Sequence, residues 1–307
     1  MSERGATSGL RTGPATGLRT GIYDLGYRRY EGARLGRAYA VLSLYLYTLR
    51  AIFGLGRSAM SKVFPIGLAI IASIPALIQL AVAAVAPEEF EYTSPENYFG
   101  FVSLVLALFC AVAAPEVIGR DQRNHTLSLY FSRSLSRADY VTAKLLALGS
   151  GVFIVLVIPQ ALLLAGNAVS TDEIVDYMKT NVDLLPPILG SAILIGTMMS
   201  GVSLAIGSQT PRRAWATGAV IAYFVIATAL GSILFETIGG DSGGYALLLS
   251  PFALLNGAVT WIFGAEPEAG GEIADAGLDG LTYFLAAVGY SALSLGLLYR
   301  RFTRMAV

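Results

Sequence analysis

The chain has 307 residues, of which 55% are hydrophobic and only 14% are charged, and its formal net charge is zero. Soluble domains carry about 25% charged residues, so this composition and the long apolar runs predict a polytopic membrane protein. A single cysteine, Cys110, excludes an internal disulfide and any cysteine-based metal cluster. A single histidine, His125, cannot supply the paired histidines of a membrane metalloprotease.

The first 62 residues precede the first long apolar run. Residues 1–21 repeat Gly-Leu-Arg-Thr-Gly without apolar periodicity, which predicts a disordered tail, and no signal peptide is expected. Residues 22–62 are predicted to be a cytoplasmic lead-in. Its tyrosine-rich start is either a folded turn or a solvated linker. Over Ala38–Lys62 apolar residues recur at helical spacing between arginines, which favours an amphipathic helix lying in the membrane interface.

Residues 63–307 are predicted to form an all-α domain with six transmembrane helices. Each charge-free run is long enough to cross a hydrocarbon core about 30 Å thick. The fourth run is rich in glycine and serine, which allow close contact between helices in lipid. The six predicted spans are Val63–Pro87, Asn97–Pro115, Leu145–Thr171, Leu184–Pro211, Ala214–Phe235 and Gly280–Tyr299.

The loops between these spans are strongly polarised in charge. Ten of the 21 Lys and Arg residues precede the first span, five lie between spans two and three, two between spans four and five, and three after span six. Only Lys179 lies on the other side, where the loops are acidic. Because basic loops stay in the cytoplasm, both termini are predicted to be cytoplasmic in the inner (plasma) membrane.

One further apolar run, Ser242–Ala265, contains 24 residues and no charge. A seventh span here would move the three C-terminal arginines to the outer side, against the charge pattern. Pro251 and the Asn256-Gly257 pair are expected to break the run into two short pieces. It is therefore predicted to be an outer re-entrant hairpin between spans five and six.

The polar stretch Pro115–Lys144 interrupts the apolar runs between spans two and three and contains the single histidine. We call residues 116–140 the elbow and predict that it is cytoplasmic. Glu116 is either paired with Arg120 one helical turn later or an ordinary charge at a helix end. For His125 a polar surface position is favoured over a chemical role, and no Ser-His-Asp set is apparent. Two amides at membrane depth, Gln160 and Asn256, are expected to hydrogen-bond between helices; lining a substrate path is the alternative.

Several of these features occur together in one known family. They are YDLGYRRYEGARLGR ahead of an amphipathic helix, six spans, the elbow sequence GRDQRNHTLSLYFSRSLSRADYVTAK, and LLSPFALLNG before the last span. From about residue 22 to its C-terminus the chain resembles the permease subunit of ABC-2 type ABC transporters. The elbow is the most specific part; Ser134 departs from it, since the family pattern has proline there. The chain contains no G-x-x-x-x-G-K-[ST] phosphate loop.

The resemblance implies a permease without catalytic activity, driven by a separate ABC ATPase subunit that binds ATP and Mg. It further implies a second permease chain (homodimer or heterodimer), contact with membrane lipid, no cofactor in this chain, no nucleic acid, and export rather than import. The elbow would dock on the ATPase, with charges that set its register and apolar anchors. The alternatives are an ATPase-independent channel or a membrane assembly scaffold, and more remotely a membrane-embedded enzyme. The candidate coupling residues are Glu116, Arg120, Asp121, Arg123, His125, Leu127, Leu129, Tyr130, Phe131 and Arg133.

Overall fold

The computed structural model describes residue 32 and residues 35–56, 59–85, 95–132, 135–170 and 174–304. Residues 1–34 form a unit separate from residues 35–307, and everything below concerns the second unit. The predicted disordered tail lies outside the described residues, as do residues 22–31, 33–34 and 57–58 of the lead-in. No strand occurs in the described part of the chain, where helices alternate with short turns.

Six helical stretches in the described residues are long and apolar enough to cross a membrane, which confirms the predicted all-α polytopic architecture. Many large apolar side chains on their outer surfaces are exposed, as expected of helices that face lipid. The six main helices are α2 (Ala59–Val85), α3 (Tyr98–Ala114), α6 (Arg137–Ser170), α8 (Leu185–Gly207), α9 (Arg213–Ile238) and α13 (Gly280–Arg304). The short helix α7 (Ile174–Thr180) and the turn η2 (Val182–Leu184) precede α8.

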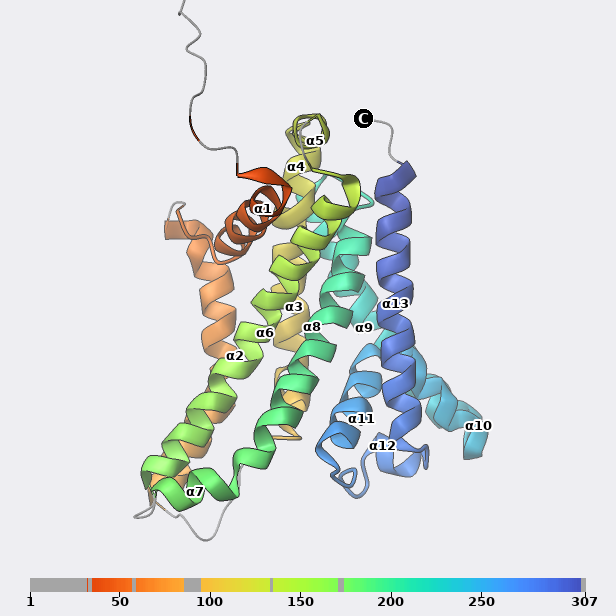
Figure 1. Ribbon diagram of the computed structural model, residues 1–307. Coiled ribbons are helices and arrows are strands. Elements are labelled where there is room, and N and C mark those ends of the chain that lie inside the picture. Colours follow the sequence, from red (N-terminus) through yellow and green to blue (C-terminus); the bar gives the residue numbers. More distant parts are fainter. Residues whose placement is uncertain are drawn as a thin grey trace, which may run out of the picture. The chain divides into compact units, whose positions relative to one another are not determined.

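The helices run between two ends of the bundle (Figure 1). The elbow and the C-terminal end of α13 lie at one end, which we call the elbow end. The opposite end, which we call the far end, carries α7 and the turns that precede α13. Among the described residues, the elbow, the loop between α8 and α9 and the C-terminal end of α13 lie at the elbow end, which agrees with the charge pattern that predicts them to be cytoplasmic.

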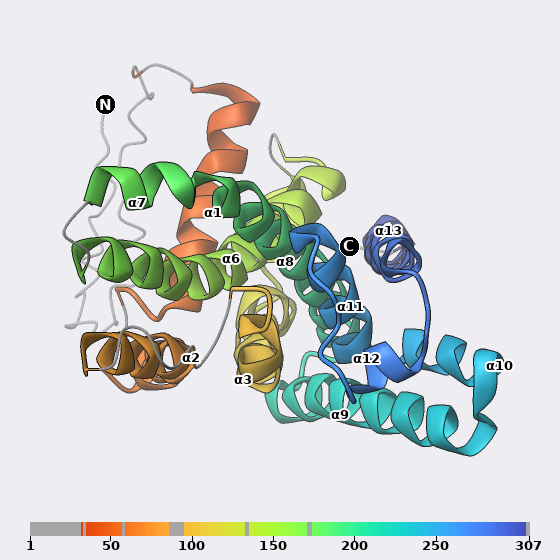
Figure 2. The ribbon, with the colours of Figure 1, turned by 90° about the horizontal axis from the view of Figure 1, so that it is seen from below.

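The amphipathic helix α1 spans Gly36–Ile52 and is shorter than predicted. It ends because Gly54 takes a left-handed conformation (φ 67°) while the N–H groups of Gly54 and Leu55 bond to Ala51 and Arg50. Residues 59–62 therefore belong to α2, not to α1. Figure 2 shows α1 lengthwise and α13 end-on, so α1 lies across the bundle. The Tyr45 hydroxyl donates a 3.0 Å hydrogen bond to Ser150 of α6.

The extra apolar run forms α10 (Gly240–Gly244), a 3-10 turn η3 (Tyr245–Leu249) and α11 (Pro251–Phe263). The chain bends by 104° before Pro251, where Ser250 Oγ caps α11 by accepting from the Ala253 N–H. α10, α11 and the following α12 (Glu272–Asp275) all lie toward the far end, so the run enters and leaves at that end. Both ends of the run lie at the far end, as the predicted re-entrant hairpin requires, but the second predicted break is wrong, because Asn256 and Gly257 lie inside α11.

Small residues allow the helices to approach closely, as the composition of the fourth span predicted. Gly196 of α8 faces Gly149 of α6, and a Cβ at position 196 would lie 3.0 Å from the Gly149 carbonyl oxygen. Gly207, at the end of α8, lies against Ala114 of α3 in the same way. Much of the buried core therefore lies between α3, α6 and α8. The elbow follows α3 without a break in the chain of helical turns.

Candidate functional site

The second span does not stop at Pro115 but continues to Arg123, so the first part of the predicted elbow is buried helix. The continuation comprises a π-helical turn η1 (Pro115–Gly119) and α4 (Arg120–Arg123). Proline has no N–H to complete the α-helical hydrogen bonds, which explains the widened turn at this position. Val117, Ile118 and Gly119 are buried among the neighbouring helices.

The chain reverses at His125, which has φ 53°. The N–H of His125 bonds to the Gln122 carbonyl and the N–H of Thr126 to the Asp121 carbonyl, which is a Schellman motif. His125 occupies the left-handed position that glycine usually takes. Its side chain is exposed, as predicted for a polar surface residue. Its left-handed backbone conformation gives it a structural role in reversing the chain. The short helix α5 (Leu127–Phe131) then leads toward α6.

Asp121 was predicted to face a partner, but it points into the protein and is only 7% exposed. Its carboxylate pairs with Lys144 Nζ of α6 at 2.8 Å and accepts a 2.8 Å hydrogen bond from the Tyr140 hydroxyl. Lys144 is 2% exposed, so both charges have left water and each depends on the other. Asp121 therefore attaches the elbow to α6 and does not belong to an exposed docking surface.

Aromatic rings surround this ion pair. Tyr140 packs against Tyr130, Phe131 and Phe302 with ring centroids 5.7, 5.8 and 5.4 Å away. Burial raises the pKa of the Tyr130 phenol, and the charge of Asp121 raises it further, so this ring remains neutral. Three of the predicted partner anchors, Leu127, Tyr130 and Phe131, are thus partly buried against the core of the chain. Only Leu129 keeps an exposed apolar side chain, at 66%.

The other side of the elbow is bonded to the loop between α8 and α9. Gln122 Nε2 donates to the Ser208 carbonyl at 3.0 Å, and an Arg123 Nη donates to the Pro211 carbonyl at 3.3 Å. Arg301 of α13 donates to the same Ser208 carbonyl at 2.9 Å. One backbone oxygen thus receives donors from two different helices, and α4, the loop and α13 are held as one unit.

Glu116 pairs with Arg213 of α9 at 3.1 Å. Spacing within one helix offers only Arg120 as a partner, so this link to another helix could not be predicted from the sequence. The ion pair joins the base of the elbow to the first turn of α9.

The exit from the elbow is held by a capping box that sequence reasoning missed. Ser136 Oγ accepts from the Asp139 N–H and the Asp139 carboxylate accepts from the Ser136 N–H, at 3.2 and 2.9 Å. Arg37 of α1 donates twice to the same carboxylate, at 2.7 and 2.9 Å. The S-x-x-D spacing before an apolar run was the signal for this cap. It starts α6 at Arg137, inside the segment assigned to the elbow.

The tip of the elbow remains available to a partner. Arg123 and Leu129 are exposed with His125, whereas Arg120 is partly buried and Arg133 lies outside the described residues. No three His, Cys, Asp or Glu side chains gather as metal ligands would within the described ranges. The arrangement offers a firmly held base and an exposed tip, which suits mechanical contact.

A second feature lies away from the elbow. The amide oxygens of Gln160 and Asn256 are buried, and neither has a hydrogen-bond partner among the described residues. The favoured prediction, helix-to-helix bonding through these groups, is therefore wrong for both oxygens. Each residue lines a cavity instead: about 120 Å³ for Gln160 and about 280 Å³ for Asn256.

Comparison with known proteins gives one match. A family model described as ABC-2 family transporter protein matches residues 35–307, which includes all six spans and the elbow. No curated protein matches the chain.

Proposed function

The chain belongs to the ABC-2 family of transporter proteins, and from this premise we propose that it is the permease subunit of a transporter powered by a separate ATPase chain. The ATPase would bind ATP and Mg, which fits the absence of a phosphate loop from this sequence. A second permease chain would complete the assembly. Export is the proposed direction, on the basis of family resemblance alone.

The observation that carries the coupling mechanism is the contrast between the base and the tip of the elbow. Its base is held by the Asp121–Lys144 pair to α6, by Glu116 to α9, and through Ser208 to α13. Its tip, with Arg123 and Leu129, projects at the elbow end (Figure 1). A partner that moves the tip would therefore move several spans together, because buried contacts transmit displacement with little slack.

The test replaces exposed tip residues only. Leu129→Asp and Arg123→Glu are each expected to weaken binding of the ATPase subunit by about tenfold or more, since an unpaired or reversed charge would be buried at the interface. Leu129 is 66% exposed, so its substitution should leave folding unaffected. Arg123→Glu also removes the 3.3 Å hydrogen bond to the Pro211 carbonyl, so the free energy of unfolding of this variant is measured alongside its binding. The measurements are co-purification of the ATPase and substrate-stimulated ATP hydrolysis in reconstituted membranes.

The matched control is Arg304→Glu, which reverses an exposed charge at the same end but outside the elbow. It should leave binding and hydrolysis unchanged. If both tip variants bind and stimulate the ATPase like the original chain, the elbow is not the coupling element. Transport by the purified chain without any ATPase would instead support a channel.

The proposed orientation places the elbow end in the cytoplasm. In a Cys110→Ala background, single cysteines at Asp183 and Glu266 are expected to react with an impermeant thiol reagent added to intact cells. Cysteines at Ser128 and Thr303 should react only after the membrane is permeabilised, which also shows that they are accessible. Labelling of Thr303 in intact cells would contradict the orientation and the even number of spans.

A further inference from the structure

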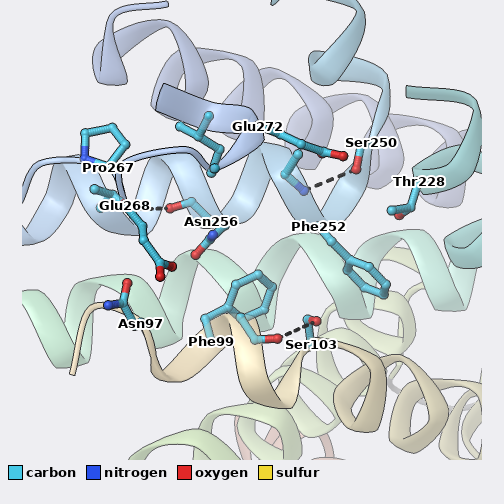
Figure 3. A pocket seen from close by; sticks show the side chains of 15 residues that line it. Asn97, Phe99, Ser103, Thr228, Ser250, Phe252, Asn256, Pro267, Glu268 and Glu272 are labelled. Carbon is cyan, nitrogen blue, oxygen red and sulfur yellow. Dashed lines mark hydrogen bonds between the residues drawn. The ribbon is translucent and has the colours of Figure 1, made fainter. Parts of the chain in front are cut away.

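The larger of the two cavities lies toward the far end and is bounded by α3, α9, α11 and α12 (Figure 3). Its volume of about 280 Å³ is just below the roughly 300–1,000 Å³ of typical ligand pockets, so it suits a small ligand or a headgroup. The bend before Pro251 creates it, because α11 returns toward the far end and leaves space beside α3.

Two oxygen atoms on the wall have no partner. The Asn256 amide oxygen and the Thr228 hydroxyl are both buried without a hydrogen bond among the described residues. Leaving a buried polar atom unpaired is unfavourable, so such an atom usually marks the place of a ligand or a water molecule. Amide and hydroxyl oxygens both accept hydrogen bonds, and a ligand with N–H groups would satisfy them.

The charged side chains on the wall are all acidic. They are Glu268 and Glu272, and no Lys, Arg or His is among the lining residues. Glu272 already accepts a 3.1 Å hydrogen bond from Ser232, whereas no ion pair or hydrogen bond reaches the Glu268 carboxylate in the described part of the chain. In Figure 3 the side-chain ends of Glu268, Asn256 and Asn97 converge on one part of the cavity.

Two aromatic residues also line the cavity. Phe99 of α3 and Phe252 of α11 both line the cavity, and their rings are drawn in Figure 3. Ring faces attract cations, and they also accommodate an apolar substituent. Carboxylate, unpaired acceptors and aromatic rings in one cavity form a site for a positively charged group that carries N–H donors.

We propose that this cavity binds a protonated amine, through Glu268 and Asn256 for the ammonium group and through the phenylalanine rings for its neighbouring carbons. An anion would be repelled by the carboxylates, whereas a neutral alcohol donates a hydrogen bond but brings no positive charge to the exposed Glu268 carboxylate. Binding of the amine is independent of the function proposed above. That the bound amine is also the transported substrate rests on that function. The amine has two possible sources, a soluble compound or an aminolipid headgroup.

The probe is 2-phenylethylamine, with 2-phenylethanol as its neutral counterpart of similar shape. The full chain in phosphatidylcholine nanodiscs is titrated with each and followed by calorimetry. Saturable binding of the amine, at least about tenfold tighter than of the alcohol, is expected from one charge-assisted hydrogen bond. Equal binding of both probes, or no saturable binding of the amine, would overturn the proposal.

Three variants locate the site. Glu268→Gln and Asn256→Leu should each weaken amine binding by about three- to tenfold, while Glu266→Gln, an exposed glutamate that does not line the cavity, should leave it unchanged. Because the Asn256 oxygen is unpaired, Asn256→Leu should unfold no more easily than the original chain. Loss of binding only in Glu266→Gln, or in none of the three, would contradict the assignment.

Nanodiscs that contain phosphatidylethanolamine separate the two sources. Its headgroup offers N–H donors, whereas the choline headgroup has none. Competition with 2-phenylethylamine would identify the ligand as an aminolipid, and undiminished binding would identify it as a soluble amine; both support the site. Since no ATPase is present, failure here leaves the coupling proposal standing, and failure of the ATPase co-purification leaves this one standing.

Discussion

Lys144→Met is expected to destabilise the chain by about 3–5 kcal/mol, because it leaves the Asp121 carboxylate buried without a cation. The Tyr140 hydroxyl would still donate to that carboxylate, but one neutral donor does not replace an ammonium group. The elbow should detach from α6, since Asp121 is its direct charged link to that helix. The measurements are the free energy of unfolding in detergent and hydrogen exchange over residues 120–131.

A double substitution separates charge from packing. Asp121→Leu combined with Lys144→Met removes both charges and is expected to restore most of the lost stability, because two apolar side chains tolerate burial. The control is Lys179→Met, which removes a lysine from an exposed pair with Asp176 and should have little effect. If Lys144→Met unfolds like the original chain, the pair does not hold the elbow.

Gly257→Ala is expected to displace the re-entrant segment from α13. A Cβ at position 257 would lie 2.6, 2.8 and 2.9 Å from three atoms of the Tyr283 ring, which is fully buried and cannot turn away. Overpacking of this kind costs about 1–3 kcal/mol, although alanine alone favours a helix by up to about 1 kcal/mol over glycine. The net result should be a lower free energy of unfolding and weaker protection of α11 from hydrogen exchange.

Gly289→Ala on α13 is the matched control, because a Cβ there meets no atom within 4 Å. It should keep or slightly raise stability. Tyr283→Val in the Gly257→Ala background should recover part of the loss by removing the ring. An undiminished free energy of unfolding in Gly257→Ala would show that α11 does not pack on α13 as described.

The elements that the sequence predicted correctly depend on composition averaged over many residues. Six apolar runs were long enough to be predicted as spans, and six helices of that kind are present among the described residues. The basic elbow and the basic C-terminal end of α13, predicted to share one side, lie at the same end of the bundle. The re-entrant run followed from the same argument, since a seventh span would have reversed the last arginines. Errors appeared where one residue decided the local geometry: Gly54 ended α1 early, and Gly257 was taken for a break although it makes room for Tyr283.

The sequence by itself determined the membrane class, the six long apolar helices and the place of the elbow between the second and third of them, because transfer of apolar side chains into lipid is nearly additive along the chain. It could not determine which elbow charges face inward. Asp121 and Arg123 are charged residues two positions apart in the same polar stretch, yet Asp121 is buried against a lysine 23 positions later on another helix while Arg123 is exposed. Likewise, Asn256 lines a cavity because α11 folds back beside α3, and the sequence does not show that contact. Burial and pairing are properties of contacts between distant segments, and only the tertiary structure sets those.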